Sequence, residues 1–226
     1  MPDAALRPTI DELPSPGVPP GVLPSALPSP GSTRSRFVDA ALACLAGRAW
    51  ARTTADDIAR AAGMSRATLY RTFPGGRDEV LAAVVQAEVA RLFEAVGAAV
   101  ADARDLAGAL AAALVVSVRH LSSHAALRGL LESEPGLLLA HLAFDRLDRV
   151  LDASSRLGAP LLARWLPEEE ARRTAEWLTR LVLSYVSCPS PGIDLGDPAD
   201  ACRVATSYVL PGVRAMGVER GRPLWT

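Results

Sequence analysis

The sequence predicts an all-α protein, and three observations lead to this prediction. From residue 33 onward, apolar residues recur at helical spacing, as in RFVDAALACLAG, where they fall at i, i+3, i+4, i+7 and i+8. Signals that start and end helices recur along the same region, whereas runs that look like strands are few. Half of the 226 residues are hydrophobic, which is enough to bury a sizeable core. We expect about nine helices and no sheet.

The composition narrows the class of protein. The net charge of the chain is −1, so any surface that binds nucleic acid must be local. Three cysteines at wide spacing, Cys44, Cys188 and Cys202, argue against a disulfide framework or a zinc site and fit a reducing cytoplasm. We expect no membrane partner, because no apolar run is long enough to span a bilayer and the N-terminus lacks a secretory signal.

Prolines set the first 31 residues apart. Nine of the 18 prolines lie in residues 1–31, so we expect this segment to be an extended or disordered tail. After residue 73, helical patterns follow one another, with Gly158 and Pro160 expected to end one helix and Pro211 to kink or shorten the last. The expected helices there are 77–97, 106–121, 124–133, 137–156, 168–187 and 199–217.

The segment TTADDIARAAGMSRATLYRTF, residues 53–73, carries the most specific pattern. Thr54 with an acid three residues later signals a helix start. Gly63 suits the left-handed residue that ends this helix, and Ser65 is a favoured N-cap for a second helix. Two short helices joined by a tight turn containing glycine make a helix-turn-helix. On spacing alone, an ordinary helical hairpin with a solvated face is the alternative. The residues expected to face inward are Ile58, Ala59 or Ala62, Leu69 and Phe73.

The outward residues of the second helix have the chemistry that a DNA groove requires. Arg66 and Arg71 can donate to guanine edges or to phosphates. Thr68 can form a hydrogen bond or contact a thymine methyl group, and Tyr70 can reach a phosphate through its hydroxyl. The small side chain of Ala67 allows a close approach of the backbone to the groove.

The charge distribution supports this interpretation. Residues 32–80 contain eight arginines against five acidic residues. The flanking ranges, 1–31 and 81–226, are each net negative. The positive excess therefore lies only in the segment that carries the expected helix-turn-helix.

The segment RSRFVDAALACLAGRAWARTTADDIARAAGMSRATLYRTF resembles the DNA-binding domain of the tetracycline-repressor (TetR/AcrR) family. An amphipathic first helix ending in Gly47 is followed by TT, DIA, AAG, MS, TLY and F in the family's order and spacing. The resemblance covers residues 34–89; the remaining chain is similar only in being helical and of the right length. It implies a TetR-type helix-turn-helix domain at 32–78, with its motif at about 54–73, and a helical ligand-binding and dimerisation domain at 79–226.

The resemblance also implies a function. We expect a cytoplasmic homodimer whose first three helices bind a double-stranded DNA operator, whose larger domain binds a small-molecule effector, and whose last two helices form the dimer interface. The expected activity is that of a ligand-responsive repressor released from its operator by an apolar or amphipathic effector. An activator of the same family, or a helical ligand-binding or adaptor protein that no longer binds DNA, are the alternatives. No nucleophile and base can be paired, so we expect neither an enzyme nor a cofactor.

The resemblance carries over DNA-contacting roles by position. It places two threonines beside the phosphates at the start of the second helix and residues 65–68 against bases. One departure follows Phe73, where PGGRDE is one residue longer than the family's usual F-x-S-K-E, lacks its serine cap and has arginine for lysine. The reach of that arginine is therefore left open. The implied DNA-binding residues are Thr53, Thr54, Ser65, Arg66, Ala67, Thr68, Tyr70, Arg71 and Arg77.

Two histidines outside the motif invite comparison with a metal site. His120 and His124 are four residues apart and can share a helix face. No HExxH pattern is present, so we expect histidines on the surface or lining a pocket, and no metal. The residues that contact the effector cannot be nominated from sequence.

Overall fold

The computed structural model describes residues 29, 31–47, 52–124 and 144–218. The all-α prediction is confirmed in these ranges, where β-type pairing is limited to an isolated bridge between Ser190 and Ile193. The expected N-terminal tail and the expected helix at 124–133 fall almost wholly outside the described residues. In chain order the elements are α1 (Thr33–Gly47), α2 (Ala55–Ala61), α3 (Arg66–Thr72), α4 (Gly76–Ala101), α5 (Leu106–Ser123), α8 (Phe144–Leu162), α9 (Glu168–Ser187), α10 (Pro198–Val204), the π-helical turn η3 (Ala205–Val209) and α11 (Leu210–Val218).

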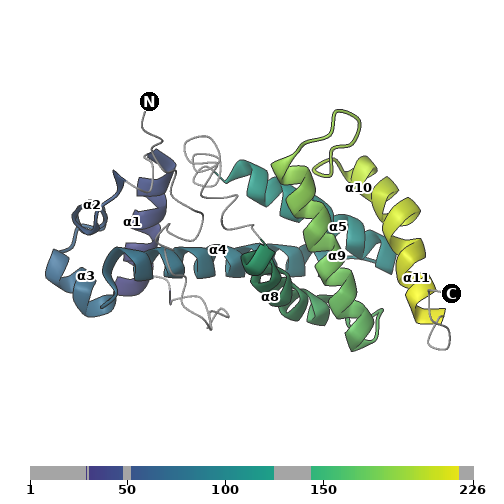
Figure 1. Ribbon diagram of the computed structural model, residues 1–226, viewed down its shortest axis with the longest axis horizontal. Helices are drawn as coiled ribbons and strands as arrows, with labels where there is room; N and C mark the ends of the chain where they lie inside the picture. The colour runs from purple at the N-terminus through teal and green to yellow at the C-terminus, as the bar shows by residue number, and fades with distance from the viewer. Residues whose placement is uncertain (1–28, 30, 48–51, 125–143, 219–226) are drawn as a thin grey trace, which may run out of the picture.

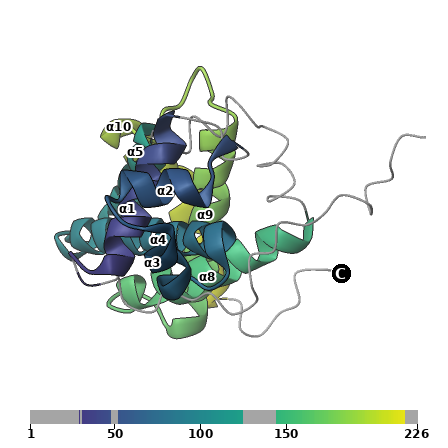
Figure 2. The ribbon, with the colours of Figure 1, turned by 90° about the vertical axis from the view of Figure 1, so that its left-hand side faces the viewer.

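The helices form two groups that α4 connects. Helices α1, α2 and α3 lie together at one end of the molecule, and α4 runs from them into a bundle of α5 and the later helices (Figure 1). Viewed from that end, α1–α3 stand in front of the bundle (Figure 2). We call α1–α3 the head and the remaining helices beyond α4 the bundle.

Each group has its own apolar core, and α4 contributes to both. In the head, Phe37 and Phe73 are fully buried and their rings meet edge to face at a centroid distance of 6.1 Å. Val84 of α4 belongs to this core, whereas Val96 and Val100 belong to the core of the bundle. The position of the head relative to the bundle therefore depends on α4.

Helix α5 is the most apolar element of the bundle. Contrary to the expectation from sequence, it is long and apolar enough to cross a membrane by length and composition alone. In the structure it packs against α4, α9 and α10, and its Leu110 and Leu114 are fully buried. The side chains that α5 buries in the bundle are Ala109, Leu110, Ala113, Leu114 and Val118.

Helix α8 corrects the prediction that Gly158 and Pro160 would end it. The helix continues to Leu162, with Pro160 close to its end, where few backbone hydrogen bonds are lost. Gly158 lies where α8 passes α9: a Cβ atom at this position would be 2.8 Å from the Cβ of Ala175. The glycine therefore permits close packing of the two helices rather than marking a boundary.

Near the C-terminus, the helical structure continues through Pro211 by a local change of hydrogen bonding. The backbone N–H of Leu210 donates to the carbonyl of Ala205, five residues earlier, at the end of η3. Because proline has no N–H and crowds the preceding turn, a π-helical turn just before Pro211 absorbs the disturbance. The expected helix at 199–217 is thus confirmed as a chain of α10, η3 and α11.

Gly158→Ala should destabilise the protein, because the added methyl group overlaps Ala175. We expect a loss of about 1–3 kcal/mol in the free energy of unfolding, as for other overpacked cores. Gly212→Ala is the matched control, since nothing lies within 4 Å of its added Cβ in α11. This control should be neutral or stabilising. Urea denaturation of both variants measures the difference; equal stabilities would contradict the close packing.

Candidate nucleic-acid interface

Helix α2 begins with the capping arrangement expected from its sequence. The Thr54 hydroxyl oxygen accepts from the N–H of Asp57 at 3.2 Å, and the Asp57 carboxylate accepts from the N–H of Thr54 at 3.0 Å. Each residue satisfies a backbone donor of the other, as in a capping box. The carboxylate also accepts from the Thr54 hydroxyl at 2.6 Å. This N-terminus is therefore fixed in place.

The turn between α2 and α3 is defined by a glycine and a serine. Gly63 has φ of 66°, the left-handed conformation that a glycine adopts without a Cβ clash. Ser65 caps α3 by accepting from the N–H of Thr68 at 3.1 Å. From α1, Arg36 donates to the carbonyl of Ala62 at 3.0 Å. The angle between the two helices is thus held by local bonds and by one bond from α1.

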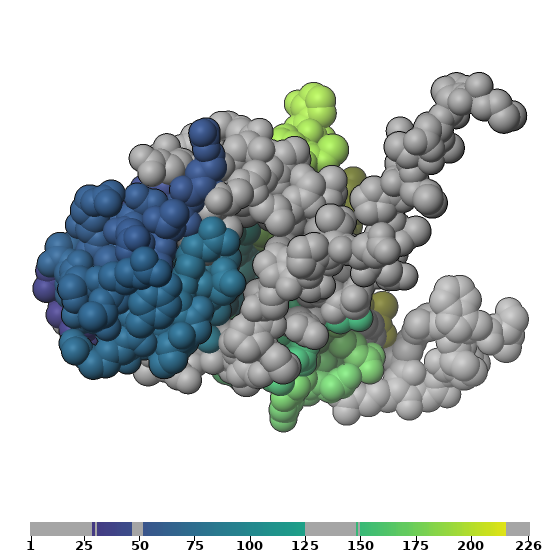
Figure 3. All heavy atoms as spheres, turned by 60° about the vertical axis from the view of Figure 1, so that its left-hand side comes forward, coloured from purple at the N-terminus to yellow at the C-terminus, as the bar shows by residue number. Residues whose placement is uncertain are grey.

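The burial of the hairpin matches the predicted inner face. All the residues expected to point inward are buried, namely Ile58, Ala59, Ala62, Leu69 and Phe73. On the other face, Arg66, Ala67, Tyr70 and Arg71 are exposed, and Thr68 is half-buried with its hydroxyl 2.9 Å from that of Ser65. In the space-filling view the head projects from one end of the molecule (Figure 3). The outward face of α3 therefore presents arginines, a tyrosine and small residues to solvent.

Arg66 is held along this face by two neighbours. Its Nη1 lies 3.2 Å from Oδ2 of Asp56 in α2, and its guanidinium stacks 5.4 Å from the ring centroid of Tyr70. The side-chain hydrogen bond to Tyr70 and then the charge of Asp56 raise the pKa of Arg66, so the guanidinium keeps its proton. Asp56 did not stand out in the sequence, because its contact with Arg66 exists only once the hairpin forms.

Thr53 and Arg77 hold the hairpin against α4. The Thr53 side chain is fully buried, and a phosphate contact by this residue stays a prediction. Arg77, at the start of α4, donates to the Thr53 carbonyl at 3.0 Å and pairs with Asp78 at 3.5 Å. Arg77 therefore links α4 to the start of α2, and a phosphate contact by Arg77 stays a prediction.

The extra residue after Phe73 positions Tyr70. Gly76 has φ of 65°, and a Cβ atom here would lie 3.0 Å from Cε1 of the Tyr70 ring. Gly75, the N-cap of α4, makes no side-chain cap hydrogen bond, but its N–H donates to the Glu79 carboxylate at 2.8 Å. The PGG run thus gives Tyr70 its place, which the sequence alone did not indicate.

Among residues 29, 31–47, 52–124 and 144–218, no group of three or more His, Cys, Asp or Glu side chains is arranged to hold a metal ion.

Known proteins are similar to this chain in sequence. The profile of bacterial regulatory proteins of the tetR family matches residues 37–84. The HTH-type transcriptional regulator AlkX of Mycobacterium tuberculosis is 31% identical over 194 residues, which cover 82% of this chain and 89% of that protein.

Two solved structures have the same fold. The TetR family repressor AlkX from Dietzia sp., implicated in biodegradation of n-alkanes, superposes with a TM-score of 0.63 at 25% identity, covering 82% of this chain and 97% of that one. The fatty acid degradation regulator FadR from Bacillus halodurans gives 0.53 at 20% identity, covering 77% and 95%, and supports the fold alone.

Gly76→Ala should be more damaging than Gly63→Ala, although both positions have the same positive φ. An alanine at either position is strained, which costs about 1–2 kcal/mol. At Gly76 the methyl group also meets the Tyr70 ring, whereas at Gly63 its nearest neighbour is 3.8 Å away. Urea unfolding should therefore show the larger loss for Gly76→Ala. Adding Tyr70→Ala should recover part of the difference; purely additive effects would contradict the contact.

Proposed function

Because this chain belongs to the TetR family of bacterial transcriptional regulators, we propose that α3 of its head reads operator DNA and that the protein represses transcription until an effector binds. The chain is a DNA-binding transcriptional regulator. The observation that carries the residue-level proposal is the exposed face of α3, where Arg66 lies next to the capped N-terminus and Tyr70 and Arg71 lie further along the helix. The alternatives of an activator or a protein that no longer binds DNA predict different outcomes in the experiments below.

The residues of α3 divide into two roles. Arg66 lies in the first turn, where a recognition helix approaches base edges, and its guanidinium can donate two hydrogen bonds to a guanine. Binding requires that Arg66 exchange its contact with Asp56 for a base, which is cheap because both side chains are well exposed. Arg71 and Tyr70 lie further along the helix and are proposed to contact phosphates, which position the protein without reading sequence.

Arg66→Ala and Arg71→Ala should weaken operator binding in different ways. Loss of a base contact should cost about 1–3 kcal/mol and relax preference at one operator position. Loss of a phosphate contact should weaken all sequences equally and reduce the salt slope by about one. Mobility shifts at several salt concentrations measure both effects.

Arg104→Ala is the matched control, because Arg104 is an exposed arginine between α4 and α5, outside the head and outside α9. It should leave operator affinity unchanged. Unaltered binding by both head variants would contradict the proposed interface, and the absence of any shift by the unmodified chain would favour an adaptor protein.

The proposed homodimer uses the far end of the bundle. Trp177 of α9 and Tyr208 of η3 are 58% and 73% exposed, which is unusual for large aromatic side chains. Helix α11, which continues from η3, packs against α9, so the two aromatic residues belong to neighbouring elements. Exposed aromatic residues of this size mark interfaces, and a two-fold axis there would bring two heads to one operator.

Trp177→Glu and Tyr208→Glu should convert the dimer to a monomer, because each places a charge where an apolar contact is expected. Val85→Glu is the matched control, since Val85 is 47% exposed and belongs to α4, which carries neither aromatic residue. Sedimentation equilibrium measures the mass. A dimer that persists in both aromatic variants would place the interface elsewhere.

We further propose that the effector is an amphipathic molecule with a long alkyl chain. Support comes from the similarity to the AlkX repressor implicated in biodegradation of n-alkanes and from the apolar character of α5. Such an effector acts only if it binds better to the form of the protein that misfits the operator.

A long-chain fatty acid should release operator DNA, and short-chain acids should not. A promoter fusion expressed in the cytoplasm, where we place this protein, separates repression from activation; no catalytic role is proposed.

A further inference from the structure

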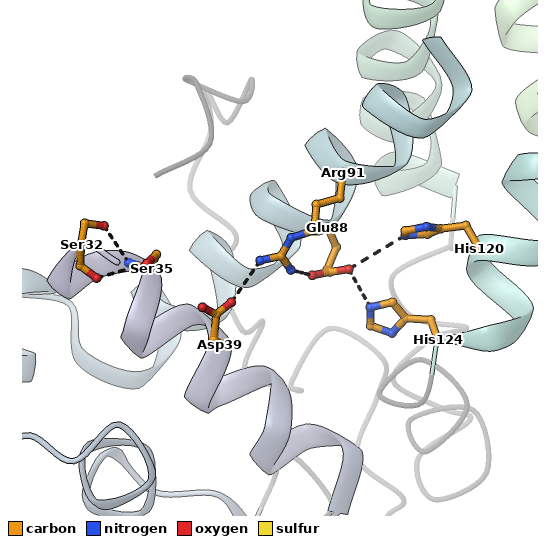
Figure 4. A network of polar contacts seen from close by, with 7 residues as sticks. All are labelled: Ser32, Ser35, Asp39, Glu88, Arg91, His120 and His124. Carbon is orange, nitrogen blue, oxygen red and sulfur yellow. Dashed lines mark hydrogen bonds and ion pairs between the residues drawn. The ribbon is translucent and has the colours of Figure 1, made fainter. Parts of the chain in front are cut away.

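A polar network occupies the stretch of α4 between the two apolar cores. Ala87 is the last α4 residue in the core of the head, and Leu92 is the first that packs against the core of the bundle. Between them, Glu88 and Arg91 project from α4 (Figure 4). The network therefore lies where the head meets the bundle.

The network runs from α1 in the head to the end of α5 in the bundle. Arg91 pairs through one nitrogen with Oε1 of Glu88 and through the other with Oδ1 of Asp39 in α1, at 3.0 Å. The second carboxylate oxygen, Oε2 of Glu88, lies 2.8 Å from Nε2 of His124 and 3.9 Å from Nε2 of His120. The expectation that both histidines sit on a surface or in a pocket is thus refined: both face one carboxylate.

Burial makes the centre of this network stronger than an ordinary surface ion pair. The Glu88 and His124 side chains are each 18% exposed, whereas Asp39 is 59% exposed. An exposed pair such as Asp39 and Arg91 alone contributes little. At Glu88, water is largely excluded, and loss of one partner leaves a half-buried charge less well satisfied.

We propose that Glu88 is a positioning residue for DNA binding, because one of its oxygens holds the head through Arg91 and Asp39 while the other holds the end of α5 through His124. When the end of α5 is displaced, the contact between His124 and the Glu88 carboxylate changes, and so does the contact of this carboxylate with Arg91. The head then moves because Arg91 is also paired with Asp39 of α1. This proposal rests on the proposed function, since it concerns how the bundle controls the DNA-binding face of α3.

Protonation of His120 affects the same network around Glu88. Nε2 of His120 is buried without a hydrogen bond, and burial lowers the pKa of His120 below its ordinary value of 6.5. The neighbouring charge of Glu88 raises the pKa of His120, whereas His124 and Arg91 lower it. Asp39 is paired with Arg91 on the far side of the network. An arrangement that opens the network and hydrates His120 takes up a proton more readily. Acid therefore favours the open arrangement, and the closed one is lost as pH falls below 6.5.

The experiment measures the energetic coupling between Asp39 and His124, which are connected through Arg91 and Glu88. Operator affinity is measured for Asp39→Asn, His124→Gln, the double variant, and each of these with Glu88→Gln. Each single change should weaken binding by about two- to thirtyfold. The double variant should bind the operator only slightly less tightly than the single variant with the lower affinity. In the presence of Glu88→Gln, neither Asp39→Asn nor His124→Gln should change operator affinity further.

The matched control combines Asp39→Asn with Glu176→Gln, because Glu176 on α9 pairs with Arg180 and shares no partner with Asp39. For independent sites, the fold-losses in operator affinity should multiply to within about twofold. If the fold-losses of Asp39→Asn and His124→Gln also multiply within that limit, the proposal fails. Glu88→Gln keeps the size of the side chain. If the Glu88→Gln protein nevertheless fails to fold, the double-mutant cycle of Asp39→Asn and His124→Gln decides on its own.

A pH series provides a readout that a purely structural role would not move. Operator affinity of the unmodified chain should fall as the pH decreases below 6.5, and His120→Asn should flatten this fall. Identical profiles for the two proteins would overturn the role of His120. If the unmodified chain binds no DNA at any pH, the proposed function fails separately, and the same cycle measured on urea midpoints decides whether Glu88 couples α1 to α5.

Discussion

The whole arrangement depends on one continuous helix that two cores share. Helix α4 has 26 residues, which corresponds to a length of about 39 Å. Its first turns are buried with α1–α3 and its last turns with α5 and the bundle. A rigid element shared in this way cannot shift at one end without displacing what packs on the other. Function therefore requires that the course of α4 be well defined, and different chemistry fixes its start and its middle.

At the head, the constraint is geometric. A pair of glycines after Phe73 admits a left-handed residue at Gly76, and the absence of a Cβ there gives the Tyr70 ring its place. Arg77 then ties α4 to the carbonyl of Thr53. The face of α3 is consequently oriented by the start of α4, so a change in the direction of α4 changes what α3 presents to DNA. In the middle of α4 the constraint is electrostatic, with a single carboxylate between a guanidinium and an imidazole.

Local signals explain why much of the head could be predicted from sequence. The caps at Thr54 and Ser65 and the turn at Gly63 depend on residues within four positions of each other, and all three were confirmed. Gly158 shows the opposite case. A glycine followed by proline suggests a helix end, but its role is set by Ala175 of another helix.

The same reason limits the functional residues that sequence can nominate. Thr53 has the family's position and residue type, yet its side chain is buried. Glu88 belongs to no motif, and only the packing of α4 on α5 brings two histidines to it. Contacts between elements distant in sequence have no local pattern, so they become visible only in three dimensions.

The central claim is that two copies of α3, held by α4, read one operator. Selection of bound sequences from a random pool of double-stranded DNA by the purified full-length chain tests it most directly. We expect enrichment of an inverted repeat whose half-sites lie about 34–36 Å apart or at a related multiple. Enrichment of no sequence, or of a single site without two-fold symmetry, would contradict it.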